Sequence, residues 1–168
     1  LNSIVSKNNK LIDLSVKEFS DEITRESPAP GGGSVSAYLG TLASSLGAMV
    51  ANLSANKRGW EDKVDLFSDL ADQINSIRND LLDLVDEDSV AFNKIMESFK
   101  LPKNTEEEIK IRLNSINESS LYAAEVPLRV MKKSKLNIRC WCCLFMYIFG
   151  YLWGLLECKN KLKRNVRR

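Results

Sequence analysis

One acidic residue interrupts an otherwise apolar helical face. Asp88 lies four residues after Leu84 and four residues before Phe92, so it shares their side of a helix. A carboxylate on such a face loses part of its hydration, which raises its pKa and suits it to moving protons near neutral pH. We therefore take Asp88 as the first catalytic candidate and Asp86, which lies off this face, as the second. The alternative is that Asp88 pairs with a lysine or arginine, or caps a kink.

A glycine-rich loop is the second feature that suggests chemistry. Residues 27–37 read SPAPGGGSVSA, and a long apolar helical pattern follows the glycines directly. Consecutive glycines let a backbone approach another group closely, and the first N–H groups of the helix point into this loop. Such a terminus suits an anion or a polar heterocycle. Gly31, Gly32, Gly33 and Ser34 are the expected donors, and Ser36 is a weaker candidate because it also suits packing. A flexible hinge is the alternative interpretation.

Composition excludes several classes of site. The chain has 168 residues, no histidine, and 24 Lys and Arg against 22 Asp and Glu. The small net charge argues against a general nucleic-acid binder. Without histidine, Ser-His and Cys-His catalysis and histidine-ligated metal sites are excluded. The four cysteines lie from residue 140 onward, and residues 1–10 do not resemble a signal peptide. We therefore expect a cytoplasmic protein.

Hydrophobic periodicity predicts four helices and no strands. A capping box at Ser15 and Glu18 starts a first helix that ends near residue 26. A second helix is expected from residue 33 or 34 to about 55, and a third from about 60 to 100. A second capping box, at Thr105 and Glu108, starts a fourth helix, which Pro127 should kink or end. The predicted fold class is all-α, an up-and-down helical bundle with long helices.

The second predicted helix carries two stripes. One is apolar and the other consists of small residues that would let another backbone approach. Because the helix contains no charged residue, we expect it to be buried nearly all round, as a central bundle helix or a dimer seam. The apolar stripe comprises Val35, Leu39, Leu42, Leu46, Met49 or Val50, and Leu53, and the small stripe comprises Ser36, Gly40, Ser44, Gly47, Ala51 and Ala55.

The composition changes near the C-terminus. Residues 140–156 are uncharged and mostly apolar, and a basic segment follows them. Three interpretations stay open: a membrane anchor, a buried terminal helix, or a segment from another reading frame. We accordingly divide the chain into a flexible N-terminal arm (1–10), a helical domain (11–134) and an atypical tail (135–168) that is rich in cysteine and tryptophan and ends in basic residues.

Five sequence segments in order resemble the cyclodeaminase/cyclohydrolase family of folate enzymes. They are PAPGGGSVSA (28–37), MVANLSANK (49–57), LVDEDSVAF (84–92), LPKNTEEE (101–108) with Arg112, and VPL (126–128). The resemblance covers about residues 11–131. This family includes the cyclodeaminase domain of formimidoyltransferase-cyclodeaminase and bacterial methenyltetrahydrofolate cyclohydrolases.

The resemblance implies an all-helical domain that forms a homodimer or higher homo-oligomer. It implies a tetrahydrofolate derivative as substrate, with no bound cofactor and no metal. The family closes one-carbon units across N5 and N10 of tetrahydrofolate with release of ammonia, a step of the histidine-derived one-carbon route, or opens the 5,10-methenyl bridge with water.

The resemblance also suggests roles for basic residues. Lys57 and Arg58 would neutralise the glutamate tail of folate, although a solvated basic turn is equally expected. Lys103 and Arg112 match family segments, and surface ion pairs with the acidic residues 106–108 are the alternative.

After Ser134 the chain departs from the family pattern, because later Gly-Asn and Ser-Asp elements are missing. This predicts a truncated or frameshifted member with uncovered apolar faces on the second and third helices. The alternative functions are an inactive helical bundle that acts only in assembly and a tail-anchored membrane protein whose membrane contact is limited to 140–156.

Overall fold

The computed structural model describes residues 10–165, and this part of the chain is helical without strands. The predicted all-α class is therefore confirmed. Two 3-10 turns, η2 (Leu11–Asp13) and η3 (Glu61–Lys63), accompany four helices. The helices are α1 (Val16–Ile23), α2 (Gly32–Ala55), α3 (Val64–Lys100) and α4 (Glu106–Asn165).

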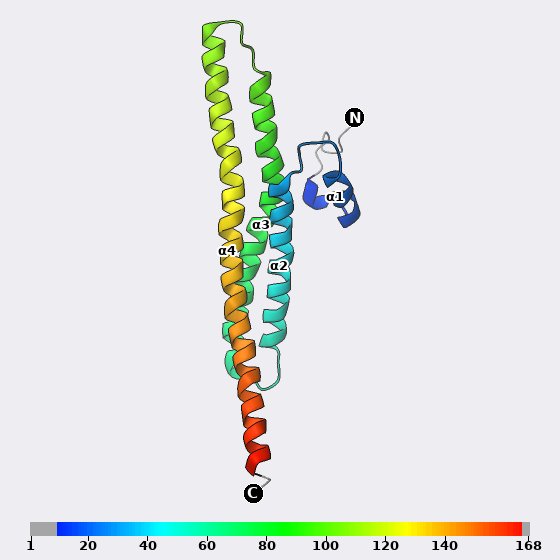
Figure 1. The fold of residues 1–168 in the computed structure, drawn as a ribbon, viewed down its shortest axis with the longest axis vertical. Helices are drawn as coiled ribbons and strands as arrows, with labels where there is room; N and C mark the ends of the chain where they lie inside the picture. Colours follow the sequence, from blue (N-terminus) through cyan, green and yellow to red (C-terminus); the bar gives the residue numbers. More distant parts are fainter. Residues whose placement is uncertain (1–9, 166–168) are drawn as a thin grey trace.

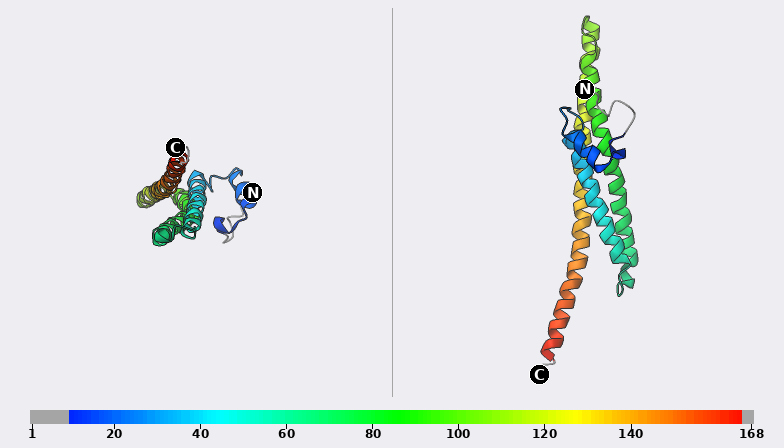
Figure 2. Two further views of the ribbon diagram at one scale, coloured as in Figure 1. Left: turned by 90° about the horizontal axis from the view of Figure 1, so that it is seen from below. Right: turned by 90° about the vertical axis from the view of Figure 1, so that its right-hand side faces the viewer.

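The three long helices run up and down beside one another (Figure 1). α3 and α4 form a long antiparallel hairpin, and α2 packs against both along the part of α3 that precedes about residue 89. α1 and η2 stand to one side of this bundle, near the N-terminus of α2 (Figure 2). The beginning of α2 thus lies at mid-height of the hairpin, and the hairpin extends beyond it.

Local sequence signals explain the helix boundaries. Ser15 caps α1, and its side chain and that of Glu18 form both halves of a capping box. At the start of α4, the backbone N–H of Glu108 donates to the hydroxyl of Thr105, as predicted. Gly59 adopts a φ of 84° in the turn between α2 and η3, a conformation that side chains other than glycine's rarely adopt.

The orientation of α2 differs from the prediction. Its small residues other than Ser36 face the bundle, whereas Leu39, Leu42, Leu46, Met49 and Leu53 are 44% to 67% exposed. The prediction that α2 is buried nearly all round is therefore wrong for the single chain. The physical reason is close packing, because the small face lets α3 and α4 approach the α2 backbone. A Cβ atom on Gly40, for example, would lie 3.0 Å from Leu81 Cδ1.

Of the two outcomes expected at Pro127, an end of the helix does not occur, because α4 continues to Asn165. Proline removes one backbone hydrogen bond, but Val126 and Val130 on either side of it are buried in the core, and their packing holds the helix together. The boundary expected at residue 134 does not interrupt the helix. Beyond it, Trp141 Nε1 donates to the backbone oxygen of Ala43 over 3.1 Å, and Leu144 is buried.

The core consists of two clusters along α3. One lies at the level of η2 and α1 and includes Leu81, Leu84 and Val85, and the other surrounds Trp60 and Phe67. Met96 and Phe99, toward the end of α3, are 42% and 49% exposed. They lie on the part of the hairpin that α2 does not reach.

Among the described residues, α2 is the one helix with the length and composition of a membrane span. Core helices of soluble proteins have the same composition, and 39% of its apolar window is buried. The part of the predicted 140–156 segment that follows Ile148 lies outside the residues whose side chains are described.

Candidate functional site

Three consecutive carboxylates on α3 reach three different elements. Asp86 accepts a hydrogen bond from the backbone of η2, Glu87 contacts α4, and Asp88 contacts the first turn of α2. Successive residues of a helix point about 100° apart, so one short segment connects all these elements. This acidic segment, residues 86–88, is the centre of the candidate site.

Asp88 binds the N-terminus of α2. Its Oδ2 atom accepts from the backbone N–H of Ser34 over 2.9 Å and lies 3.2 Å from the Ser34 hydroxyl. Gly31, the N-cap residue, has no side chain with which to cap the helix, and Asp88 takes this role from 54 residues away. The positive end of the helix dipole adds to the attraction. Asp88 therefore caps the N-terminus of a helix, a role that differs from the kink cap given as an alternative.

Gly33 makes this contact possible. A Cβ atom at this position would lie 2.1 Å from Asp88 Oδ1 and 2.4 Å from Asp88 Cγ. Gly32, in contrast, has nothing within 4 Å of the corresponding position. The glycine loop is therefore more than a hinge, because the carboxylate of Asp88 occupies the space that a side chain at position 33 would need.

Hydrogen-bonding capacity is left over at this junction. No described residue accepts from the backbone N–H of Gly32 or Gly33, or donates to Asp88 Oδ1. One carboxylate oxygen is thus held while the other faces the glycine backbone. This geometry places a proton acceptor beside two N–H donors.

Ser34 serves Asp88 rather than an external ligand. Its side chain is fully buried, and its hydroxyl lies 2.8 Å from the Val85 backbone oxygen and 3.4 Å from the Ser89 hydroxyl. The predicted role of the Ser34 hydroxyl as a donor to substrate does not fit this burial. Instead, the hydroxyl and N–H of Ser34 fix the position of the catalytic candidate.

Asp86 anchors the N-terminal segment. Its Oδ1 atom accepts from the backbone N–H of Leu11 over 2.6 Å. Burial raises the pKa of the Asp86 carboxyl, with Asp13 adding to the rise, while the Leu11 N–H and Lys10 oppose it. Although Asp86 lies off the apolar face of the helix, it is half-buried beneath η2.

Glu87 was missed at the level of sequence, because it lies off the apolar stripe. Its Oε1 atom accepts from Tyr122 Oη over 2.8 Å and from Arg129 Nη1 over 2.6 Å. Burial pushes the pKa of Glu87 upward, but the hydrogen bonds from Arg129 and Tyr122 outweigh it and leave the pKa below its ordinary value. Glu87 therefore joins α3 to α4 beside the Asp88 contact.

Asp86 and Glu87 should affect stability in opposite ways as the pH changes. A folded-state pKa above the unfolded value weakens the folded state as the pH rises through it, whereas a depressed pKa stabilises the folded state at higher pH. Asp86→Asn should therefore raise stability relative to the wild type at neutral pH, with the gain shrinking as the pH falls toward 3.8. Glu87→Gln should lower it at neutral pH, with the loss shrinking below 4.5.

Urea denaturation of the two variants and the wild type between about pH 3 and 7.5, a range that runs from below these ordinary pKa values to neutral pH, measures both effects. The same sign of pH dependence for both variants would contradict this assignment.

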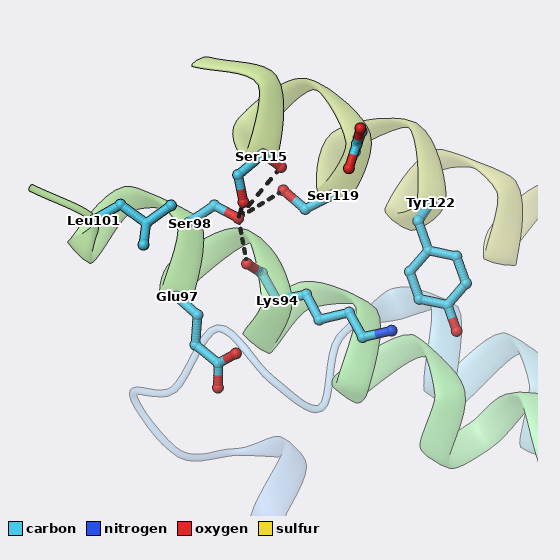
Figure 3. A pocket seen from close by; sticks show the side chains of 8 residues that line it. Lys94, Glu97, Ser98, Leu101, Ser115, Ser119 and Tyr122 are labelled. Atoms are coloured by element: carbon cyan, nitrogen blue, oxygen red, sulfur yellow. Dashed lines mark hydrogen bonds between the residues drawn. The ribbon is translucent and has the colours of Figure 1, made fainter. Parts of the chain in front are cut away.

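A pocket lies between α3 and α4 beyond the acidic segment (Figure 3). Its volume is about 480 Å³, within the range of small-molecule sites. Ser98 is buried between the helices, and its hydroxyl lies 2.9 Å from the Ser115 hydroxyl and 3.2 Å from that of Ser119. Tyr122 and Leu101 line the two ends, as Figure 3 shows.

The pocket is connected to the acidic segment through Tyr122. This residue lines the pocket and also donates to Glu87, and Lys94 Nζ lies 4.4 Å from the centre of its ring. Glu87, Lys94 and Ser98 recur at helical spacing on one face of α3. The pocket therefore begins at Lys94, about 9 Å of helix rise beyond Asp88. At this level α2 has not yet begun, so it does not cover the α3–α4 hairpin.

Other predicted binding residues lie away from Asp88. Ser36 points to the exposed side of α2. Lys57 and Arg58 follow the C-terminus of α2, about 36 Å along a helix of 24 residues, and the Lys57 Nζ atom lies 4.3 Å from the Trp60 ring centre. Within one chain, these residues and the glycine loop do not form a single site.

Lys103 and Arg112 lie at the far end of the hairpin. Lys103 is exposed in the α3–α4 turn, and Arg112 Nη2 donates to the Phe99 backbone oxygen over 3.3 Å. Their predicted contact with substrate stays a prediction. In the region whose side chains are described, no cluster of three or more potential metal ligands occurs.

The chain is similar in sequence to a known protein family and to individual members of it. The family model described as formiminotransferase-cyclodeaminase matches residues 15–145, so the similarity extends beyond the departure expected at residue 134. The chain is 33% identical over 153 residues to formimidoyltransferase-cyclodeaminase from Gallus gallus, covering 91% of this chain and 27% of that protein. It is 31% identical to methenyltetrahydrofolate cyclohydrolase from Methylorubrum extorquens, covering 67% of this chain and 54% of that protein.

The fold is shared with a solved structure. Formiminotetrahydrofolate cyclodeaminase from Thermotoga maritima superposes with a TM-score of 0.51 at 23% identity, covering 90% of this chain and 94% of that one. The chain spans about a quarter of the animal relatives' length and about half of the bacterial cyclohydrolase's. Because the family model covers most of the chain, the protein belongs to the formiminotransferase-cyclodeaminase family, in its cyclodeaminase part.

Proposed function

We propose that this protein is a folate one-carbon enzyme that closes or opens the N5–N10 bridge of tetrahydrofolate. The observation that carries the proposal is the match of residues 15–145 to a family whose similar members are named cyclodeaminases and a cyclohydrolase. The Asp88 carboxylate beside the N-terminus of α2 supports it, because both reactions need a positioned proton carrier.

The two reactions share one chemical requirement. In ring closure, N10 of 5-formimidoyltetrahydrofolate attacks the formimidoyl carbon, N10 loses a proton, and the leaving nitrogen gains protons and departs as ammonia. In ring opening, water attacks the methenyl carbon of 5,10-methenyltetrahydrofolate, a proton leaves the water, and the carbon–N5 bond breaks. In our proposal Asp88 takes up the proton in the first step of either reaction and returns it to the departing nitrogen.

The glycine backbone complements Asp88. The N–H groups of Gly32 and Gly33, at the positive end of α2, would hold a polar group of the substrate. Gly31 precedes them as the N-cap residue and lets the chain enter the helix without a side chain in the way. The substrate is a tetrahydrofolate derivative, and no bound cofactor is required for this chemistry.

Turnover of both substrates tests this function. We would follow 5,10-methenyltetrahydrofolate by its absorbance, once as product from 5-formimidoyltetrahydrofolate and once as reactant with water. A rate above the uncatalysed reaction in either direction supports the proposal and identifies the substrate. Rates equal to background in both directions would contradict it and would favour the alternative of a helical bundle that acts only in assembly.

We further propose that the protein works as a homo-oligomer in which a second copy covers α2. Four leucines and Met49 are exposed along one face of α2, and a contiguous exposed apolar surface is typical of an interaction site. We expect Leu42→Glu with Leu46→Glu to shift the protein toward monomer in analytical ultracentrifugation, because two charges would have to be buried in the interface.

Val16→Glu is the control for placing a glutamate at an exposed apolar position, here on α1 and away from the apolar face of α2. A wild-type chain that sediments as a monomer at micromolar concentration would refute the association through α2.

A further inference from the structure

We infer that the outer face of α4 is a self-association surface, on which α4 of a second copy of this chain packs in the antiparallel direction. This face is distinct from the apolar face of α2, and the inference does not depend on the folate reaction. It is carried by a heptad pattern of exposed apolar residues, by the distribution of charge beside them, and by one lysine within the pattern.

Exposed residues recur along the outer face of α4 at alternating spacings of three and four. This is the spacing of the a and d positions of a coiled coil, and when it is sustained over about three heptads it predicts pairing with another helix. The large apolar side chains at these positions are 46% to 68% exposed. We call this set the outer stripe, and it comprises Leu121, Ala124, Leu128, Met131, Lys135, Ile138, Cys142 and Phe145.

The outer stripe lies opposite the residues by which α4 joins the bundle. Val126 and Leu144 are buried in the two core clusters, whereas Arg129 contacts α3 and Trp141 contacts α2. These residues occupy other heptad positions than the stripe, so the stripe turns away from both neighbouring helices. Viewed end-on, one side of α4 is correspondingly free of α2 and α3 (Figure 2). The stripe is therefore available to a helix from outside the single chain.

Charged residues border the outer stripe in two halves of opposite sign. The e position, which follows each d position, holds Glu118 and Glu125 in the first half and Lys132 and Arg139 in the second. All four side chains are exposed, and none belongs to an ion pair among the described residues. In an antiparallel pair of helices the e positions of the two copies face each other. The acidic half of one copy then meets the basic half of the other, and such flanking charges set partner and direction.

The parallel direction lacks this complementarity. It would bring Lys135 of one copy against Lys135 of the other between the two helices, where like charges repel. In the antiparallel direction, Lys135 instead faces Ala124 of the second copy. This small side chain leaves room for the lysine stem, whose charged end can extend toward the neighbouring Glu125.

One register satisfies the apolar pattern and the charge pattern together. Because the contact is two-fold symmetric, each pairing occurs twice in it. The apolar stripe supplies the buried area, and the flanking ion pairs fix the direction and the register. The residues that face each other across the two copies in this register are Leu121 and Ile138, Ala124 and Lys135, Leu128 and Met131, Glu118 and Arg139, and Glu125 and Lys132.

Charge exchange between two variants tests the inference. Both are made in the Leu42→Glu, Leu46→Glu protein, so that association through α2 does not contribute. The first variant adds Glu118→Lys with Glu125→Lys, and the second adds Lys132→Glu with Arg139→Glu.

Analytical ultracentrifugation measures the self-association of each variant and of their equimolar mixture. We expect each variant alone to self-associate at least about tenfold more weakly than the parent protein, because each ion pair becomes a contact between like charges. The mixture should associate at least as tightly as the parent, since every e position then faces the opposite charge.

Asp65→Lys with Asp72→Lys, in the same parent protein, is the matched control. It reverses two exposed carboxylates at the same spacing of seven residues, but on α3, and it should leave self-association unchanged. Circular dichroism melting of each variant verifies its folding.

Three results would each overturn the inference: a parent protein that is folded and monomeric at micromolar concentration, charge variants that self-associate as tightly as the parent, or a mixture that stays monomeric. None of these results bears on turnover, so the failure of this inference and the failure of the proposed function are distinguishable.

Discussion

Gly33→Ala should inactivate the protein while leaving it folded. The new methyl group would lie 2.1 Å from Asp88 Oδ1, so the Asp88 side chain must rotate away from the first turn of α2. A displacement of a catalytic group by about 1 Å can reduce the rate roughly a hundredfold, and we expect at least this loss in kcat.

The effect of this change on folding should be small. Losing the charge-assisted hydrogen bond from the Ser34 N–H costs about 1.5–3 kcal/mol, and the better helix propensity of alanine offsets roughly 1 kcal/mol of this. Gly32→Ala is the matched control for folding, because a Cβ atom there meets nothing within 4 Å. Equal unfolding free energies and equal kcat for the Gly33→Ala variant and the wild type would contradict the close packing that we describe.

Much of the secondary structure could be predicted from local sequence. The capping boxes at Ser15 and Thr105 begin helices where expected, because a cap involves residues three apart in the chain. The apolar periodicity of α3 likewise predicted one long helix. That α4 continues through Pro127 instead of ending there depends on the tertiary packing of Val126 and Val130, which no local rule contains.

The orientation of α2 could not be predicted from its periodicity. A helical pattern identifies an apolar face and a small-residue face, but it does not say which one meets the neighbouring helix. Here the small face packs inward because α4 approaches closely enough for Asn137 and Trp141 to reach the backbone oxygens of Gly40 and Ala43. The apolar face is consequently left exposed in the single chain.

The candidate site was predicted in part. Asp88 was identifiable because it breaks an apolar stripe, and the glycines were identifiable because three occur together. Their direct contact was not, since Ser34 and Asp88 are 54 residues apart in the sequence. Glu87 could not be identified as a site residue from the sequence, because a charged residue off the apolar face usually faces solvent. Its partners Tyr122 and Arg129 become visible only when α4 is placed against α3.

Asp88→Asn should lower kcat by roughly a hundredfold to ten-thousandfold, the range typical of a lost general acid or base. The asparagine oxygen can still accept from the Ser34 N–H, so the first turn of α2 stays capped. The stability should fall by no more than about 2 kcal/mol, the upper limit for a charge at a helix terminus. KM should change little, because Asp88 moves protons rather than holding the folate ring.

Asp83→Asn is the matched control for this substitution. It removes the same charge from an exposed position of α3, five residues earlier in the chain. Its kcat should equal that of the wild type. This result would show that removing a negative charge from α3 does not by itself lower kcat.

The most direct test of the central claim is kcat for 5,10-methenyltetrahydrofolate formation and hydrolysis by the wild type, Asp88→Asn and Asp83→Asn side by side. We expect turnover above background by the wild type and Asp83→Asn, and a loss of at least about a hundredfold in Asp88→Asn with its fold intact. An Asp88→Asn variant that turns over folate as fast as the wild type would show that the carboxylate at the N-terminus of α2 only caps a helix.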